Sequence, residues 1–252
     1  MYKISIIIPI LNEEIFIDRI LSFFTNSEFP PHEIIVSDGG SEDFSLQLVR
    51  KYTSVKIHHS SKKCRATQMN EAAKLYATGE VYYFVHADVV PPKTWFTDIQ
   101  ESLKEKSNIG GYRFKFDSNR PLLRLNSWVT RFNTLSFRGG DQTVFISSAL
   151  FKELNGYKDW SIMEEYDLIK RAKESGSKYK LIPKDVLVSA RKYENNTYFK
   201  INLANLLAWV KFRLGVDHRK IKESYFRMIK DQVSRMKLSY AQDSCALTQI
   251  KK

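Results

Sequence analysis

The chain has 252 residues, and its 40 lysines and arginines exceed its 28 aspartates and glutamates, which gives a formal net charge of +12. Its composition, 43% hydrophobic and 27% charged, excludes a disordered, collagen-like or low-complexity chain and predicts a packed core. The two cysteines, Cys64 and Cys245, are too few and too far apart for a disulfide framework or a cysteine zinc site.

The first half of the chain alternates strand patterns with helix patterns. Residues 3–10 are a β-branched run, typical of a strand that is buried on both faces. The next segment places Ile17, Ile20, Leu21 and Phe24 on one helical face. The predicted strands are 3–10, 32–37, 55–59 and 81–86, and the predicted helices are 13–24, 41–52, 65–77 and 93–106. This alternation predicts a doubly wound α/β domain with a mainly parallel sheet.

The alternation changes after Gly110. We expect an extended segment at 110–117, an aromatic-rich stretch at 122–137, a strand at 143–147, a helix at 163–175 and short strands at 179–182 and 186–189. Two helical patterns, 198–214 and 221–238, and a loose end at 239–252 follow. We therefore expect one globular domain, residues 1–190, with a basic helical extension at 191–252.

The extension carries most of the excess positive charge. Residues 184–252 contain 15 lysines and arginines and 6 aspartates and glutamates, a local net charge of 15 − 6 = +9. No nucleic-acid-binding motif accompanies this charge, so we expect no nucleic-acid partner. Residues 198–213 mix aromatic, aliphatic and basic side chains. This pattern is typical of a helix that packs on the domain or on a second subunit, as in a homodimer, or of an interfacial helix on an anionic membrane.

No apolar run reaches the roughly 20 residues that a membrane-spanning helix needs. The first three residues lead directly into a strand pattern, without the cleavage site of a secretory signal. We therefore expect a cytoplasmic protein, with peripheral contact at the inner face of the membrane as a further hypothesis.

Polar side chains follow three of the four predicted strands. They lie at Asn12–Glu14, Asp38–Ser41 and His86–Asp88. In an open parallel sheet, ligands bind beyond the carboxyl ends of the strands, where loops and helix N-termini supply free N–H groups. Asp38 could accept hydrogen bonds from a base or a ribose, and Gly39 could let the ligand approach the backbone. Helix capping and an Asp-Gly turn would also explain these residues.

Two groups of carboxylates could carry chemistry. Asp88 follows a strongly apolar strand, where a divalent cation would offset the cost of burying a carboxylate, although Asp88 could also cap a turn. Glu164, Glu165 and Asp167 lie at a predicted helix start, where they either complement the helix dipole or raise one another's pKa, as a general base requires.

Three cations, Lys62, Lys63 and Arg65, lie before and at the start of a predicted helix. Positive charge opposes the helix dipole at this position, so an anionic ligand explains these residues better than helix stability does.

Together these motifs resemble family 2 glycosyltransferases, which are inverting, nucleotide-sugar-dependent transferases with the GT-A fold. The resemblance covers about residues 3–190 and depends on the order of five motifs. They are the opening strand and loop at 6–14, the nucleotide-binding Asp segment at 34–41, the metal element His86-Ala87-Asp88, the acceptor-site turn Gly140-Asp141-Gln142 and the base motif Met163-Glu164-Glu165. The resemblance implies an α/β fold of GT-A type, with a Rossmann-like, mainly parallel sheet flanked by helices.

The resemblance also implies roles for the motif residues. The nucleotide site would comprise residues of the first two strand ends and one cation, namely Pro9, Leu11, Asn12, Glu13, Asp38, Gly39 and Arg65. The acceptor site would comprise Gly140, Asp141 and Gln142. Asp88 would bind Mn²⁺ or Mg²⁺, and Glu165 would take the proton from the acceptor hydroxyl.

Two departures from the family pattern affect these roles. His86 stands where many members have the first Asp of the metal motif, so metal affinity would depend on Asp88 and the donor's diphosphate. Glu165 replaces the more usual Asp. Either the backbone compensates for the longer side chain, or the base is Glu164 or Asp167, or activity is reduced.

The implied reaction transfers a sugar from a UDP- or GDP-sugar to an acceptor hydroxyl, with inversion at the anomeric carbon. The acceptor would be lipid-linked if the extension lies on a membrane. A nucleotidyltransferase is a second hypothesis, although its usual Gly-rich basic loop is replaced here by an acidic loop. A nucleotide-binding scaffold without catalysis is a third hypothesis, suggested by Glu165.

Overall fold

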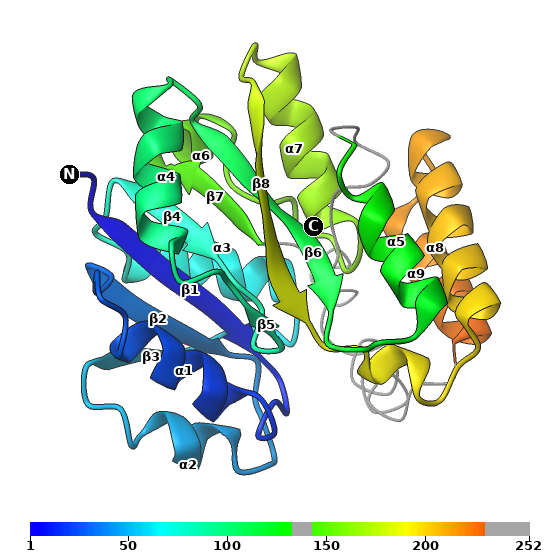
Figure 1. Ribbon diagram of the computed structural model, residues 1–252, viewed down its shortest axis with the longest axis horizontal. Helices are drawn as coiled ribbons and strands as arrows, with labels where there is room; N and C mark the ends of the chain where they lie inside the picture. Colours follow the sequence, from blue (N-terminus) through cyan, green and yellow to red (C-terminus); the bar gives the residue numbers. More distant parts are fainter. Residues whose placement is uncertain (133–142, 230–252) are drawn as a thin grey trace, which may run out of the picture.

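The structure is a computed structural model that describes residues 1–132 and 143–229. These residues form an eight-stranded sheet in the order β3-β2-β1-β4-β7-β6-β8-β5, with helices on both faces (Figure 1). The expected layered α/β architecture is therefore confirmed.

The first half of the chain forms the predicted parallel part of the sheet. β1 (Ile4–Ile10) pairs with β2 (Glu33–Asp38) and β4 (Val81–Phe84), and β2 pairs with β3 (Val55–His59), all in parallel. Helices α1 (Ile17–Thr25), α2 (Ser45–Val49) and α3 (Arg65–Leu75) connect these strands. Every residue of β1 and β2 is buried, which explains their continuous apolar runs.

The second half makes the sheet mixed. After α4 (Trp95–Lys104), β6 (Ile109–Phe116) runs antiparallel to β7 (Val144–Ser147), and β7 is antiparallel to β4 as well. β8 (Tyr179–Val188) runs parallel to β6, and the short β5 (Val89–Val90) pairs with β8 in antiparallel fashion. Helices α5 (Pro121–Val129), α6 (Ser148–Glu153) and α7 (Glu164–Glu174) complete this half.

Several element predictions for the second half need correction. The two strands expected at 179–182 and 186–189 are one strand, β8, because a register shift beside Tyr112 and Arg113 of β6 absorbs the irregularity. The sequence reasoning missed α6, which begins where the Ser147 side chain accepts a hydrogen bond from the Leu150 N–H. It also left α5 unassigned within the aromatic-rich stretch.

Two hydrophobic clusters cover the two faces of the sheet. Alternate residues of β1 enter different clusters, as strand geometry requires. Ile6 and Ile8 pack with α1 and α4, whereas Ile7 packs with α3 and α7.

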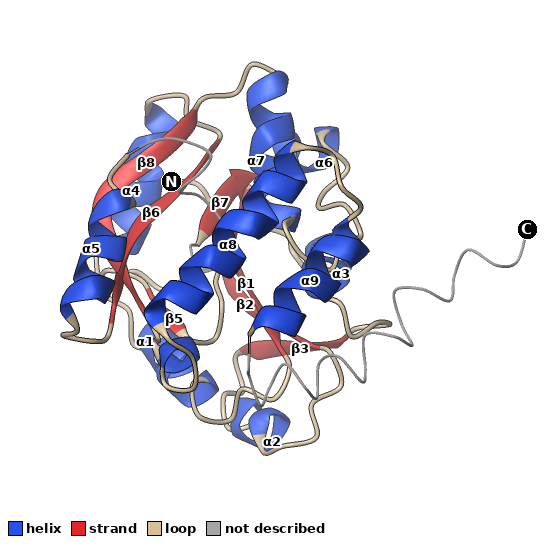
Figure 2. Cartoon of the chain, turned by 90° about the vertical axis from the view of Figure 1, so that its right-hand side faces the viewer, coloured by secondary structure: helices blue, strands red, loops and turns tan. Residues whose placement is uncertain are grey.

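A pair of helices, α8 (Tyr198–Arg213) and α9 (His218–Met228), follows a 3-10 turn at Arg191–Tyr193. Figure 2 shows α8 crossing one side of the molecule between α5 and α9. The second helix begins three residues before its predicted start at 221. Among the described residues, no helix combines the length and apolar character needed to cross a membrane.

Candidate functional site

Asp38 ends β2, directly opposite Ile10, the last residue of β1. Its carboxylate is 2% exposed and accepts hydrogen bonds from the N–H groups of Gly40 and Ser41, each at 3.0 Å. Gly40 has a φ of +87°, a value that favours glycine. Asp38 therefore shapes the tight turn at the carboxyl edge of the sheet.

The loops that follow β1 and β2 are joined by reciprocal hydrogen bonds. The Asn12 N–H donates to Ser41 Oγ at 3.0 Å, and Asn12 Oδ1 accepts from the Glu42 N–H at 2.8 Å. The Glu13 N–H donates to Ser45 Oγ at 2.8 Å. These bonds hold residues 41–44 in a loop, so α2 is shorter than the predicted helix 41–52. Asn12 is thus a residue that holds the two loops together.

Gln68 of α3, which the sequence reasoning missed, supports the same edge. Its side-chain amide donates to the carbonyl oxygens of Ile10 and Ser37 at 2.7 and 2.8 Å. A Cβ atom at Gly39 would lie 2.9 Å from this amide nitrogen. A side chain at position 39 would therefore displace the Gln68 amide, so Gly39 has a packing role here. The signal that could have found Gln68 is a polar residue on the buried face of a predicted helix.

Arg191 contacts both Glu13, which was predicted for the nucleotide site, and Asp88, which was predicted to bind the metal. Its guanidinium makes a two-point ion pair with Glu13, at 2.8 and 3.0 Å, and Nη2 lies 3.2 Å from Asp88 Oδ2. The guanidinium carbon also lies 4.8 Å from the centroid of the Phe16 ring. We expected residue 191 to open the extension, so the sequence reasoning missed its place in the site.

The start of α7 carries three buried carboxylates, Glu164, Glu165 and Asp167. Met163, which precedes them, has a left-handed backbone with a φ of 65°. Glu164 pairs with the Arg65 guanidinium, and Glu165 Oε1 lies 2.9 Å from His86 Nε2. Because an ionised carboxylate only accepts, a hydrogen bond to ionised Glu165 requires His86 to donate through Nε2. His86 is two residues before Asp88, so the predicted base Glu165 contacts the segment of chain that carries the predicted metal ligand.

Glu164 and Tyr157 provide buried polar atoms at this site. Within the described residues, Glu164 Oε2 and the Tyr157 hydroxyl are buried without a hydrogen-bond partner. Burial raises the pKa of Tyr157 well above its ordinary value, and the negative charges of Glu165 and Glu164 raise it further. The Tyr157 hydroxyl therefore stays protonated and can donate to a ligand or to a water molecule.

Asp167 has a different environment from the two glutamates. Arg171 Nε contacts one of its oxygens at 2.6 Å, and Lys158 Nζ contacts the other at 2.9 Å. Arg171 also donates to the backbone carbonyls of Leu154 and Gly156. These contacts connect α7 to the segment that precedes it, so Asp167 has a structural role.

Other predicted residues have simpler positions. Pro9 is buried within β1 opposite Ser37, and Leu11 is half-buried just beyond the end of the strand. Lys62 pairs with Asp159 at 2.8 Å, and Lys63 lies 3.3 Å from Glu42. The predicted acceptor residues Gly140, Asp141 and Gln142 lie outside the described residues.

In the candidate site, Asp88 is the one carboxylate predicted to serve as an oxygen ligand for a divalent cation. Across 1–132 and 143–229, no three His, Cys, Asp or Glu side chains converge into a metal-binding group. Asp88 already faces one positive charge, that of Arg191. A single carboxylate fits Mg²⁺ or Mn²⁺ when substrate phosphates and water complete the shell.

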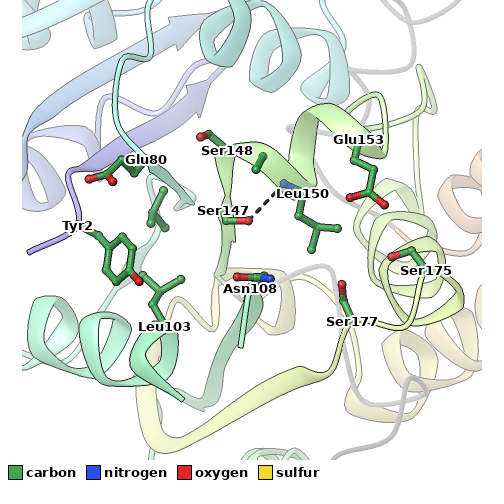
Figure 3. Close-up of a pocket in the computed structure, with 12 residues that line it drawn as sticks. Tyr2, Glu80, Leu103, Asn108, Ser147, Ser148, Leu150, Glu153, Ser175 and Ser177 are labelled. Atoms are coloured by element: carbon green, nitrogen blue, oxygen red, sulfur yellow. Dashed lines mark hydrogen bonds between the residues drawn. The ribbon is translucent and has the colours of Figure 1, made fainter. Parts of the chain in front are cut away.

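A cavity of about 440 Å³ opens elsewhere on the molecule (Figure 3). It lies at the opposite end of β4 from His86 and Asp88, because Val81 and Glu80 line it together with Ser147 at the end of β7. None of the residues predicted for the site lines this cavity.

The contacts above form one continuous group around the carboxyl ends of β1, β2 and β4. Asp38 holds Ser41, Ser41 contacts Asn12, and the adjacent Glu13 pairs with Arg191. Arg191 reaches Asp88, and His86 on the same segment reaches Glu165. Residues that are far apart in the sequence therefore meet at one edge of the sheet.

Comparisons with known proteins show the fold and the family of this chain. The structure resembles TarS from S. aureus (TM-score 0.63, 19% identity, 93% of this chain and 83% of that one). It also resembles the mannosyltransferase PcManGT from Pyrobaculum calidifontis (TM-score 0.61, 18% identity, 82% of this chain and 62% of that one). At these identities the likeness shows the fold alone, and it confirms the expected GT-A type.

In sequence, the chain is 28% identical over 123 residues to a dolichyl N-acetyl-α-D-glucosaminyl phosphate 3-β-D-2,3-diacetamido-2,3-dideoxy-β-D-glucuronosyltransferase of Methanococcus voltae. The match covers 44% of this chain and 38% of that protein, so the chain spans well under two thirds of its relative. The model of the family described as glycosyl transferase family 2 matches residues 5–154, which is more than half of the chain. The chain therefore belongs to glycosyl transferase family 2.

Proposed function

We propose that this chain is an inverting glycosyltransferase that moves a sugar from a UDP- or GDP-sugar to an acceptor hydroxyl, with the help of a divalent metal. The observation that carries the proposal is the meeting of Glu13, Asp88 and Arg191 beside the His86–Glu165 pair. A donor diphosphate needs positive charge, and an acceptor hydroxyl needs a base, and this edge of the sheet offers both.

The nucleoside would bind at the ends of β1 and β2. Asp38 ends β2 at this edge, and hydrogen bonds join the loops around Asn12 and Ser41 without a ligand. A preformed site loses little conformational entropy on binding. Solved structures of TarS with UDP-GlcNAc and of PcManGT with GDP-Man and Mn²⁺ support the class of donor.

Glu165 would act as the base, and His86 would position it. Glu165 is 2% exposed, and its contact with His86 Nε2 fixes the orientation of the carboxylate. Glu164 is the weaker candidate because the Arg65 guanidinium pairs with one of its oxygens, and Asp167 has both oxygens occupied by cations. A carboxylate that removes the hydroxyl proton while the acceptor attacks from the face opposite the leaving group gives inversion.

Asp88 would hold the metal together with the donor's phosphates. When bound, the cation neutralises charge that develops on the departing nucleoside diphosphate. Arg65, at the start of α3, is 37% exposed and could contact the same diphosphate.

We further propose that the acceptor is lipid-linked. The name of the Methanococcus voltae relative includes a dolichyl phosphate. A membrane-bound acceptor also agrees with a place at the inner face of the membrane.

The test is a transfer assay combined with ligand binding. Thermal unfolding should shift upward with UDP or GDP and shift further when Mn²⁺ is added, because a ligand that binds only the folded state stabilises it. The product of the preferred donor should have the opposite anomeric configuration by NMR. Retention of configuration would exclude the single displacement, and no shift with any nucleotide would remove the nucleotide-sugar proposal.

A further inference from the structure

The outward side of α8 is apolar and exposed. Six of its flanking or outward residues are large hydrophobics that are more than a third exposed: Phe199, Leu203, Leu206, Leu207, Val210 and Leu214. We call these six residues the outer face of α8. A helix that is apolar all round is normally buried on all sides.

The outer face lies opposite a second apolar face that is buried. At 3.6 residues per turn, the outer residues fall within a stripe of about 100°. Ile201, Ala204, Ala208 and Phe212 point the other way and are 9% exposed or less. Within residues 1–132 and 143–229, packing therefore accounts for one side of α8 and leaves the other side exposed.

The basic residues of α8 flank its outer face. By the same helical geometry, Lys200 and Lys211 lie along one edge of the stripe and Arg213 along the other. Residues 195–216 contain these three cations and no aspartate or glutamate. Apolar and basic residues in this arrangement are typical of helices that lie in the interface of an anionic membrane.

Helix α5 extends this surface on the side of the molecule that Figure 2 turns toward the viewer. Leu122, Leu125 and Trp128 of α5 are between 42% and 55% exposed. The segment 118–132 contains three arginines and no acidic residue. Helices α5 and α8 therefore both carry exposed apolar side chains and only positive charges, and they lie on the same side of the molecule.

We propose that the outer face of α8, together with α5, rests on an anionic lipid surface. The positive charge around these helices favours an anionic lipid surface over a second copy of the chain as the partner. In a two-fold dimer the same patch would face itself, so the cations of one copy would meet those of the other without acidic partners. An anionic leaflet attracts both helices at once.

This orientation would keep the catalytic edge close to the membrane. The buried face of α8 packs against Met163, the residue directly before Glu164 and Glu165, through Ala208 and Phe212. One helix thus separates the proposed base motif from the lipid surface. The inference goes beyond the proposed transfer reaction, because it concerns where the chain binds and not which donor it uses.

The experiment is flotation of the full chain with phosphatidylcholine vesicles, with and without phosphatidylglycerol, in the absence of nucleotide. We expect binding only to the phosphatidylglycerol vesicles, with weaker binding as salt rises. Leu206→Glu should reduce partitioning roughly tenfold or more, because it removes apolar burial and adds repulsion. Leu75→Glu is the matched control: Leu75 is 64% exposed on α3, Leu206 is 55% exposed, and the control should bind as the unchanged chain does.

Three results would overturn the proposal. They are no binding of the unchanged chain to anionic vesicles, equal binding by Leu206→Glu, or a concentration-dependent dimer in vesicle-free solution that Leu206→Glu dissociates. Thermal unfolding of each variant shows whether it folds, and a nucleotide-induced shift in the same samples tests the donor proposal separately. If the unchanged chain does not bind anionic vesicles but keeps its nucleotide-induced shift, the membrane proposal is contradicted and the donor proposal is not.

Discussion

Arg191 Nη2 lies 3.2 Å from Asp88 Oδ2, so a guanidinium occupies one side of the carboxylate that is proposed to hold a metal. The same guanidinium is fixed by Glu13 and stacks on Phe16. Positive charge on this side of Asp88 opposes the approach of a bare cation. In the proposed complex, the donor's diphosphate would bring the negative charge that makes a cation favourable, so metal binding would be coupled to donor binding.

Arg191→Gln should therefore bind Mn²⁺ more tightly than the unchanged chain when no nucleotide is present. We expect a gain of about tenfold, the lower end of what one nearby charge does to a carboxylate. Titration of free Mn²⁺ by electron paramagnetic resonance measures this directly. Lys192→Gln removes the same charge one residue further on and is the control. Equal Mn²⁺ affinity in all three proteins would contradict the coupling.

Asp88→Ala should lose most of the metal-dependent turnover and keep its fold. Asp88 is partly exposed in the turn between β4 and β5, so its removal leaves no large cavity. Turnover measured across a range of Mn²⁺ concentrations and circular dichroism of the variant give the two readouts. A variant that stays fully active would remove the metal role of Asp88.

Glu165→Gln should lower kcat by about 10²- to 10⁴-fold, the usual contribution of a general base, while donor affinity changes little. The substitution keeps the shape of the side chain and its contact with His86 but removes the basic oxygen. Steady-state kinetics and donor binding by calorimetry separate the two effects. Glu164→Gln is the comparison, since Arg65 pairs with Glu164; if that variant loses turnover and Glu165→Gln does not, the base is Glu164.

Elements that depend on local sequence patterns were predictable, whereas contacts between residues far apart in the sequence were not. The strands and helices of the first half were predictable because hydrophobic periodicity is a local signal, and the topology rule then placed Glu13, Asp38 and Asp88 at one edge of the sheet. Arg191 is 178 positions from Glu13 in the sequence, so no local pattern points to their contact. Likewise, α2 begins only at Ser45 because side chains of the loop after β1 accept hydrogen bonds from the Glu42 and Phe44 N–H groups, and helix propensity does not record such contacts.

Asp167→Asn tests the structural role of the third acidic residue of α7. The substitution leaves Arg171 and Lys158 without their shared carboxylate, in contacts that are now 2.6 and 2.9 Å long. We expect a loss of about 2–3 kcal/mol in the free energy of unfolding, less than for a fully buried pair because Lys158 is half-exposed. Urea denaturation measures the loss. A variant that is stable but inactive would instead make Asp167 part of the catalytic machinery.

Glu33 should make stability depend on acid pH. Burial alone would raise the pKa of Glu33, but hydrogen bonds from Lys56, Ser5 and Thr78 outweigh it and lower the pKa from 4.5 to about 2. Because the folded pKa is the lower one, the stabilisation is fully present above pH 4.5 and is lost as the pH falls from there through about 2. It amounts to at most about 3 kcal/mol, reduced by solvent screening of the half-exposed Lys56.

Glu33→Gln removes this titration. Urea denaturation at several values between neutral and acid pH should therefore show a smaller decline in stability for Glu33→Gln than for the unchanged chain. Glu28→Gln, which changes an exposed glutamate five positions earlier, is the control and should leave the decline as it is. Parallel declines in all three proteins would show that other carboxylates dominate the acid sensitivity of the fold.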